Sequence, residues 1–291
     1  MWIEKEDWER ALADLDAAIR LAPADAKSHH LRALVLFQKH QLDKAIAGFS
    51  EAIRLDPSFA LAYRDRGLAW DARRFFDKAF ADLSEAIRLD PENVALVMSR
   101  AKVCSTRGRH IEAMAEYAWV LQRRPTDPAV YMARGEALLL DLQSEAAIAE
   151  FTKALEVDPT AIQALILRAK AWNRHFQYAR AIDDYAEAIR RADDDPAPPH
   201  LPGLLATCPA RAFRDGPRAV QEGTMACELT HWNSPECLDA LSAACAEAGD
   251  FTSAVKWESK AVKLLKSGDK ALHRLYVARR AMYEFKHPYR D

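Results

Sequence analysis

The chain has 291 residues, of which 50% are hydrophobic, 29% charged and 9% aromatic, a composition that excludes disordered and fibrous proteins. Forty-one basic and forty-three acidic side chains leave a net charge of −2, which argues against a surface built mainly to bind nucleic-acid phosphates. Nine glycines are few for a glycine-rich α/β enzyme, and no apolar run approaches the ~20 residues of a membrane helix.

A repeat with a period of 34 residues runs through the first two thirds of the chain. Prolines, alanines and a bulky apolar position all recur at this step. The prolines are Pro23, Pro57, Pro91, Pro125 and Pro159, the alanines are Ala11, Ala45, Ala79, Ala113, Ala147 and Ala181, and the bulky residues are Leu15, Phe49, Leu83, Tyr117, Phe151 and Tyr185. Six coupled copies identify a repeat protein.

Each repeat is predicted to form two helices. Tyr63, Gly67 and Trp70 are spaced four and three residues apart, on one face of a first helix. The apolar residues over 76–89 keep the same spacing on a second helix, which ends before Pro91 because proline cannot continue a helix. We therefore predict an all-α protein, more than roughly 60% helical, with no strands and with connections at the five prolines.

The pattern strongly resembles the tetratricopeptide repeat (TPR), whose period and whose small, aromatic and proline positions it matches over nearly the whole chain. The resemblance implies a right-handed α-solenoid of stacked antiparallel helix pairs, the TPR superhelix, with a concave groove. It also implies protein–protein recognition rather than catalysis. In this register a partial first repeat occupies 1–25, and five units follow at 26–59, 60–93, 94–127, 128–161 and 162–195.

The register breaks at 192–202, where ADDDPAPPHLP carries four prolines and three consecutive aspartates and predicts a non-helical loop. Downstream, Ala219 and Ala254 take the alanine position again, after steps of 38 and 35 residues. Residues 196–268 are therefore interpreted as two further, divergent TPR-like units, resembling a C-terminal module of many bacterial TPR proteins. Because of Pro199 and Pro202, its first helix is expected to cover only about Gly203–Thr207.

The segment 269–291 is predicted to be a capping helix, over about Asp269–Phe285, followed by a tail. Lysines and arginines are expected on its outer side, and its packed side is expected to carry Leu272, Leu275, Tyr276, Met282 and Tyr283.

At the other end, Trp2 falls at the register of Trp70 on a first helix, so Met1–Ile3 is interpreted as the remnant of a helix. An uncovered first repeat would leave apolar area in water. Self-association through this uncapped N-terminal end is one hypothesis, and coverage by an upstream segment is the other.

Ligands of the family lie on positions two, five, nine, twelve and thirteen of each unit, here called the groove positions. The resemblance implies a peptide-binding groove that includes Arg64, Leu68, Met98, Lys102, Met132, Glu136, Lys170 and Arg174. Met98 and Met132 suit adaptable packing against a partner helix or extended peptide. No unit has the lysine and asparagine set with which chaperone-binding members hold a C-terminal carboxylate. The alternative is that these side chains only pack within the solenoid.

Arginine recurs at position seven and an acidic residue at position twenty-three, with Gly48 alone interrupting the acidic series. The two series are Arg32, Arg66, Arg100, Arg134 and Arg168, and Asp14, Asp82, Glu116, Glu150 and Asp184. This recurrence predicts structural, charge-assisted pairing between helices, of about 0–1 kcal/mol per pair where the pair is exposed.

The sequence has no H-E-x-x-H, phosphate-binding loop, G-x-S-x-G or C-x-x-C motif, so no catalytic residues and no cofactor are expected. One cluster combines the thiol and imidazole ligands of a possible zinc site: Cys208, Cys227, His231 and Cys237. Its spacing is irregular, and Cys227 falls at a register held elsewhere by isoleucine and leucine, so a core role is favoured over a metal site. The five cysteines also give no regular disulfide framework.

The sequence therefore predicts a non-enzymatic interaction scaffold or adaptor that binds a protein or peptide partner in its groove. The alternative is the recognition or regulatory arm of a larger multidomain bacterial enzyme or regulator. Neither nucleic acid nor a membrane is expected as a partner. The charged N-terminus shows no signal peptide, which favours a cytoplasmic location.

Overall fold

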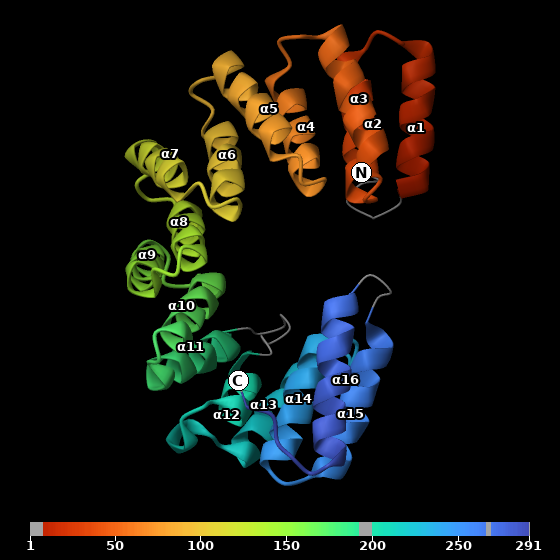
Figure 1. Ribbon diagram of the computed structural model, residues 1–291. Helices are drawn as coiled ribbons and strands as arrows, with labels where there is room; N and C mark the ends of the chain where they lie inside the picture. The colour runs from red at the N-terminus through yellow and green to blue at the C-terminus, as the bar shows by residue number, and fades with distance from the viewer. Residues whose placement is uncertain (1–7, 192–199, 266–268, 291) are drawn as a thin grey trace. The chain divides into compact units, whose positions relative to one another are not determined.

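The computed structural model describes residues 8–191, 200–265 and 269–290, of which 79% are helical and none lies in a strand (Figure 1). The all-α prediction is therefore confirmed, and helices end just before each of the five repeating prolines, as predicted. The chain divides into two compact units, 1–142 and 143–291. The expected helix remnant at Met1–Ile3 lies outside the described residues.

In its described residues, the first unit contains eight helices. They are α1 (Trp8–Leu21), α2 (Ala26–Gln38), α3 (Leu42–Leu55), α4 (Ala60–Ala72), α5 (Phe76–Leu89), α6 (Val94–Thr106), α7 (His110–Arg123) and α8 (Pro128–Leu140). The closest neighbours are α2 with α3, α4 with α5, and α6 with α7, so each repeat folds back on itself (Figure 1).

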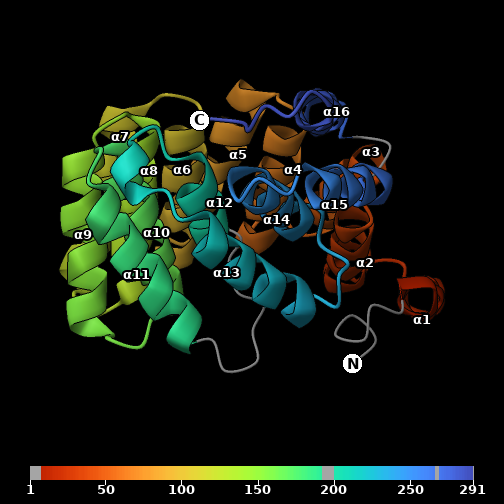
Figure 2. The same cartoon turned by 90° about the horizontal axis from the view of Figure 1, so that it is seen from below.

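The second unit continues the pairing. Its helices are α9 (Ser144–Val157), α10 (Ile162–Arg174), α11 (Tyr178–Arg191), α12 (His200–Thr207), α13 (Gly216–Leu229), α14 (Pro235–Glu247), α15 (Phe251–Leu264) and α16 (Lys270–Glu284), with a 3-10 turn at Arg211–Phe213. Figure 2 shows α13, α14 and α15 following one another in this unit. No helix in the described ranges is long and apolar enough to cross a membrane.

The turn inside each pair has a left-handed residue that recurs at the repeat period. Positive φ angles of 56 to 79° occur at His40, Arg74, Gly108, Leu142 and Phe176. The next amide closes the turn onto the first helix, as where Phe75 N–H donates to the Trp70 carbonyl oxygen at 2.9 Å. Only one of these positions is glycine, so the closing hydrogen bond and the packing of each pair offset the cost of this backbone conformation at the others.

Small and bulky residues alternate where the helices of a pair meet. The repeating alanines are buried, and Phe49 and Leu83, at the bulky position, are fully buried. The approach is close: a Cβ added to Gly48 would lie 2.8 Å from the Cβ of Ala33. The repeat is therefore a packing pattern in which alanine and glycine admit a neighbouring helix.

Three of the recurring arginines join three helices each. Arg66 Nε and Nη2 donate to the two carboxylate oxygens of Asp82 at 2.7 and 2.8 Å. Its Nη1 donates to the Ser50 hydroxyl at 3.1 Å, sixteen residues before it, on the second helix of the preceding repeat. The arrangement recurs at Arg100 with Glu116 and Ser84, and at Arg168 with Asp184 and Thr152.

The predicted charge pairing is confirmed at these three arginines. Asp82 and Asp184 are buried, so the pairs are not the exposed kind for which a small contribution applies. At Arg32 the usual acidic position is Gly48, and Arg32 Nε donates instead to Asp16 at 2.6 Å. Asp16 holds the register of Ser50, so it takes over the link to the preceding repeat.

Two predictions about the C-terminal part were wrong. The first helix after the register break begins at His200, so residues 200–202 are helical; residues 192–199 lie outside the described ranges. Pro202 is accommodated because it lies in the first turn of α12, where amides have no acceptor within the helix. On α16, Tyr276 and Tyr283 are buried as expected, but Leu272, Leu275 and Met282 are exposed.

Candidate functional site

In the first unit the predicted groove residues lie on α4, α6 and α8. Helix α6 contacts both of the others, α4 on one side and α8 on the other. Lys102 and Glu136 are exposed, whereas four others are half-buried: Arg64, Leu68, Met98 and Met132. The first unit therefore presents a mixed surface, with charged side chains outermost.

Arg64 belongs to a buried polar network. Its Nε donates to Asp65 Oδ1 at 2.7 Å, while Asp65 Oδ2 lies 2.6 Å from His30 Nε2. His30 and Asp65 are both buried, and the imidazole lies against the rings of Phe49 and Phe59. Two groove positions, at His30 and Arg64, thus hold a link between adjacent repeats.

Leu68 and Met98 also contribute to packing. Leu68 lies against the buried cluster around Leu83 and Val103, and Met98 lies against the cluster around Ala101 and Tyr117. Both side chains remain partly accessible. These two side chains therefore pack within the solenoid and can still contact a ligand.

In the second unit, Lys170 and Arg174 lie one turn apart on α10, half-buried and exposed respectively. Asn173, which precedes Arg174, lines a cavity of about 300 Å³. The other lining residues come from α11, α12, the loop after it, α14 and α16: Tyr185, Gly203, Leu204, Thr207, Cys208, Pro209, Glu236, Asp239, Ala240, Ala243, Tyr276 and Arg279.

The cavity lies on the groove positions of the divergent repeats. Counting from Ala219 as position twenty puts Leu204 at position five and Cys208 at nine. Counting from Ala254 puts Glu236 at position two and Asp239 at five. These residues were not among the predicted groove residues, although Ala219 and Ala254 fix their register.

One wall of the cavity is an ion pair. Arg279 Nη1, on α16, donates to both carboxylate oxygens of Asp239, on α14, at 2.7 and 2.6 Å. The guanidinium also lies over the ring of Tyr289, 4.1 Å from its centroid. Both charged side chains are mostly buried, so this bond fixes α16 against α14 at the edge of the cavity.

Behind this wall lies Glu258 of α15, which is completely buried. Burial, with the charge of Asp239 adding to it, raises the pKa of Glu258 to about 9. Among the described residues, neither of its carboxyl oxygens has a hydrogen-bond partner. Glu258 occupies the register of Phe49 and Leu83, so an acid replaces a bulky apolar residue here.

The cysteines behave as core residues. All five are free and buried, and Cys227 and Cys237 pack in one apolar cluster while Cys208 packs in another. Burial raises the pKa of Cys227 to about 12, so its thiol stays protonated at neutral pH. Across the described residues, no three His, Cys, Asp or Glu side chains gather closely enough to hold a metal ion.

Part of the sequence matches known family descriptions: residues 33–70 match "TPR repeat" and residues 64–128 match "Tetratricopeptide repeat". No curated protein matches the sequence.

Solved structures with the same fold include bacterial proteins. The C-terminal part of a TPR repeat-containing protein from Cytophaga hutchinsonii is 14% identical, with 93% of this chain and 95% of that chain covered and a TM-score of 0.53. The type IV pilus biogenesis factor PilW is 19% identical, covering 64% of this chain and 86% of its own, with a TM-score of 0.58. Pseudomonas aeruginosa pilF is 14% identical, covering 87% and 97%, with a TM-score of 0.52. At these identities the likeness shows the fold alone.

Proposed function

We propose a binding function for this chain, which is a tetratricopeptide-repeat protein: it is a non-enzymatic interaction scaffold that takes a protein or peptide partner on its groove positions. The repeat is a protein-interaction fold, and its stacked helices present side chains at regular intervals to an extended ligand.

The observation that carries the proposal is the cavity in the second unit. Its volume of about 300 Å³ is at the small end of ligand pockets, which suits one anchoring side chain better than a whole small molecule. The small residues Gly203, Ala240 and Ala243 line it between polar side chains. Buried anchors of this kind commonly carry most of the affinity of an interface.

The eight residues expected from the sequence extend this proposal on each unit. Lys170 and Arg174 flank Asn173 beside the cavity, and they offer cationic contacts to a ligand anchored there. In the first unit, Arg64, Leu68, Met98, Lys102, Met132 and Glu136 supply the corresponding strip.

The test fills the cavity from within. A Cβ added to Gly203 meets no atom within 4 Å, so Gly203→Leu projects into open space without displacing a neighbour. Peptides selected by display on the full-length protein would be titrated against the wild type, Gly203→Leu and a matched control, Ala118→Leu, on an exposed face of α7.

We expect Gly203→Leu to weaken binding at least about tenfold, the loss of a single anchor contact, and Ala118→Leu to leave it unchanged. A Met98→Ala/Met132→Ala variant probes the strip of the first unit in the same titration. If all selected peptides bind Gly203→Leu as tightly as the wild type, the cavity is not the anchoring site.

A further inference from the structure

The last helix, α16, has two apolar faces. Tyr276 and Tyr283 form the inner face and pack against α15 and α14, with at most 3% of either residue exposed. The second face points to solvent and carries several large apolar side chains. Its exposed fractions are 39% at Leu272, 39% at Leu275, 36% at Met282 and 77% at Phe285.

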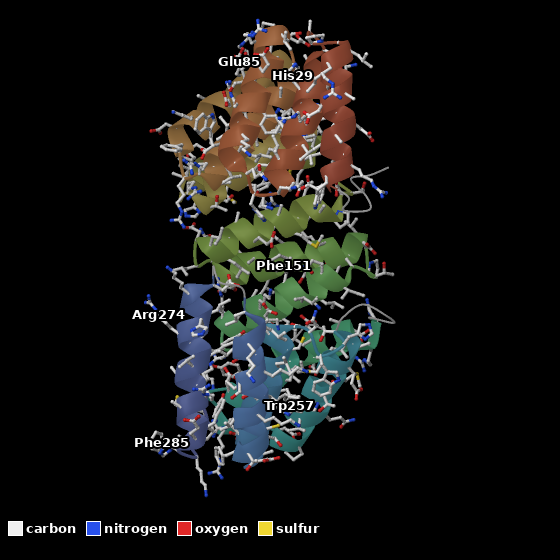
Figure 3. All side chains as sticks on the ribbon, turned by 90° about the vertical axis from the view of Figure 1, so that its right-hand side faces the viewer. His29, Glu85, Phe151, Trp257, Arg274 and Phe285 are labelled. Atoms are coloured by element: carbon white, nitrogen blue, oxygen red, sulfur yellow. The ribbon has the colours of Figure 1, made fainter. Side chains whose placement is uncertain are left out.

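Part of the outer face follows the spacing of a coiled-coil seam. Ala271, Leu275, Ala278, Met282 and Phe285 are all exposed and lie alternately four and three residues apart. We call these five residues the α16 seam. In Figure 3, Phe285 projects from α16 on the side away from α15, as does Arg274 next to the seam. A helix that ended the array as a polar cap would not carry such a row.

We propose that the α16 seam pairs in antiparallel orientation with the α16 seam of a second copy of this chain, forming a two-fold dimer. The choice of a second copy as the partner follows from the order of large and small residues along the seam. In an antiparallel pair, Leu275 lies opposite Ala278 of the second copy, and Ala271 lies opposite Met282. Each layer formed by these four residues then combines one large and one small side chain, so this stretch of the seam complements itself, and Phe285 lies beyond the paired layers.

A parallel pair fits less well. It would place Leu275 opposite Leu275 and Ala278 opposite Ala278, alternating crowded layers with gaps. The antiparallel pair also opposes the two helix dipoles favourably. Size complementarity therefore selects both the partner and its direction.

The flanks of the seam set the strength and salt dependence of the dimer. Lys270 and Arg274 lie on one side of the apolar row on α16, so two copies bring positive charges together. A helix of 15 residues is about 22 Å long, which gives a contact smaller than most stable dimers bury. We expect a weak, micromolar or weaker dimer that strengthens with added salt, because salt screens the repulsion.

Sedimentation equilibrium of the full-length protein over about 1 μM to about 1 mM tests the association. Ala278→Lys puts a charge in the centre of the seam, and we expect at least a tenfold weaker dimer. Ala118→Lys makes the same change at an exposed alanine of α7 and should match the wild type. A protein that is monomeric throughout, a dimer unaffected by Ala278→Lys, or a dimer that weakens with salt would overturn the proposal.

Cross-linking tests the direction. All native cysteines are buried, so introduced thiols dominate the reaction. In the antiparallel dimer, the double variant Ala271→Cys/Met282→Cys forms disulfides between copies, whereas either single variant holds its two thiols about 16 Å apart and does not. Efficient cross-linking of the single variants would show a parallel pair and refute the assignment.

Discussion

Replacing the buried acid on α15 should remove most of the pH dependence of the second unit's stability. The pKa of Glu258 is raised to about 9 by burial, while a glutamate in an unfolded chain has a pKa of about 4.3. Between these values the unfolded chain loses the proton and the folded unit keeps it. The free energy of unfolding therefore falls as pH rises through this window, and the acid is best tolerated below it.

The slope has a physical limit of about 1.4 kcal/mol per pH unit for one proton. Because Glu258 shares its surroundings with the Asp239 carboxylate, we expect about 2–3 kcal/mol of lost stability between pH about 5.5 and about 7.5. For a unit of this size, that corresponds to a fall of roughly 4–12 °C in Tm.

Glu258→Gln keeps the shape of the side chain but cannot ionise. Thermal unfolding followed by circular dichroism, with hydrogen exchange at α15 amides, should show a flatter pH profile and a higher Tm than the wild type at neutral pH. Glu145→Gln, an exposed acid on α9, should keep the wild-type profile. If Glu258→Gln and the wild type lose stability equally as pH rises, Glu258 is not the neutral buried acid described above.

Two further predictions concern packing between repeats. Arg66→Met should lower the free energy of unfolding in urea by about 2–4 kcal/mol, because it leaves Asp82 buried without its cation. The control Arg54→Met, at an exposed pair with Glu51, should leave the midpoint unchanged. Equal effects would contradict a structural role for the recurring arginines. Gly48→Ala should lower the free energy of unfolding by about 1–3 kcal/mol, because the added methyl group clashes with Ala33. Gly203→Ala should raise it by up to about 1 kcal/mol, because alanine has the higher helix propensity. Thermal melts in which both substitutions act alike would refute the packing argument.

The helix pairs were predictable from the sequence because one period organises proline, alanine and the bulky residues together. The outer face of α16 was not. Leu275 and Met282 belong to an amphipathic pattern, but such a pattern does not say which of two apolar sides a neighbour covers. Here Tyr276 and Tyr283 form the covered side, and this follows only from the contacts of α14 and α15.

The candidate site divides in the same way. The groove positions of Asp239 and Leu204 could be predicted from the sequence, since Ala219 and Ala254 fix the repeat register beyond the loop. The protonation of Glu258 could not, because it depends on the distance to Asp239 and on complete burial. The hydroxyls of Ser50 and Ser84 were also missed. Each serine lies at a constant spacing before a recurring arginine, but because it is uncharged, a search for opposite charges does not identify it.

The recurring arginines make the contacts between neighbouring repeats chemically equivalent, so one repeat can replace another at such a contact. Arg100 takes one acceptor, Glu116, from its own repeat and another, Ser84, from the repeat before. Excision of residues 60–93 would bring Ser50 to the place of Ser84, because the two serines are 34 residues apart. The junction would then be made with the same chemical groups as before. Gain or loss of a whole repeat thus leaves no orphaned charge at the joint, and the length of such an array can change in evolution without redesign of its interfaces.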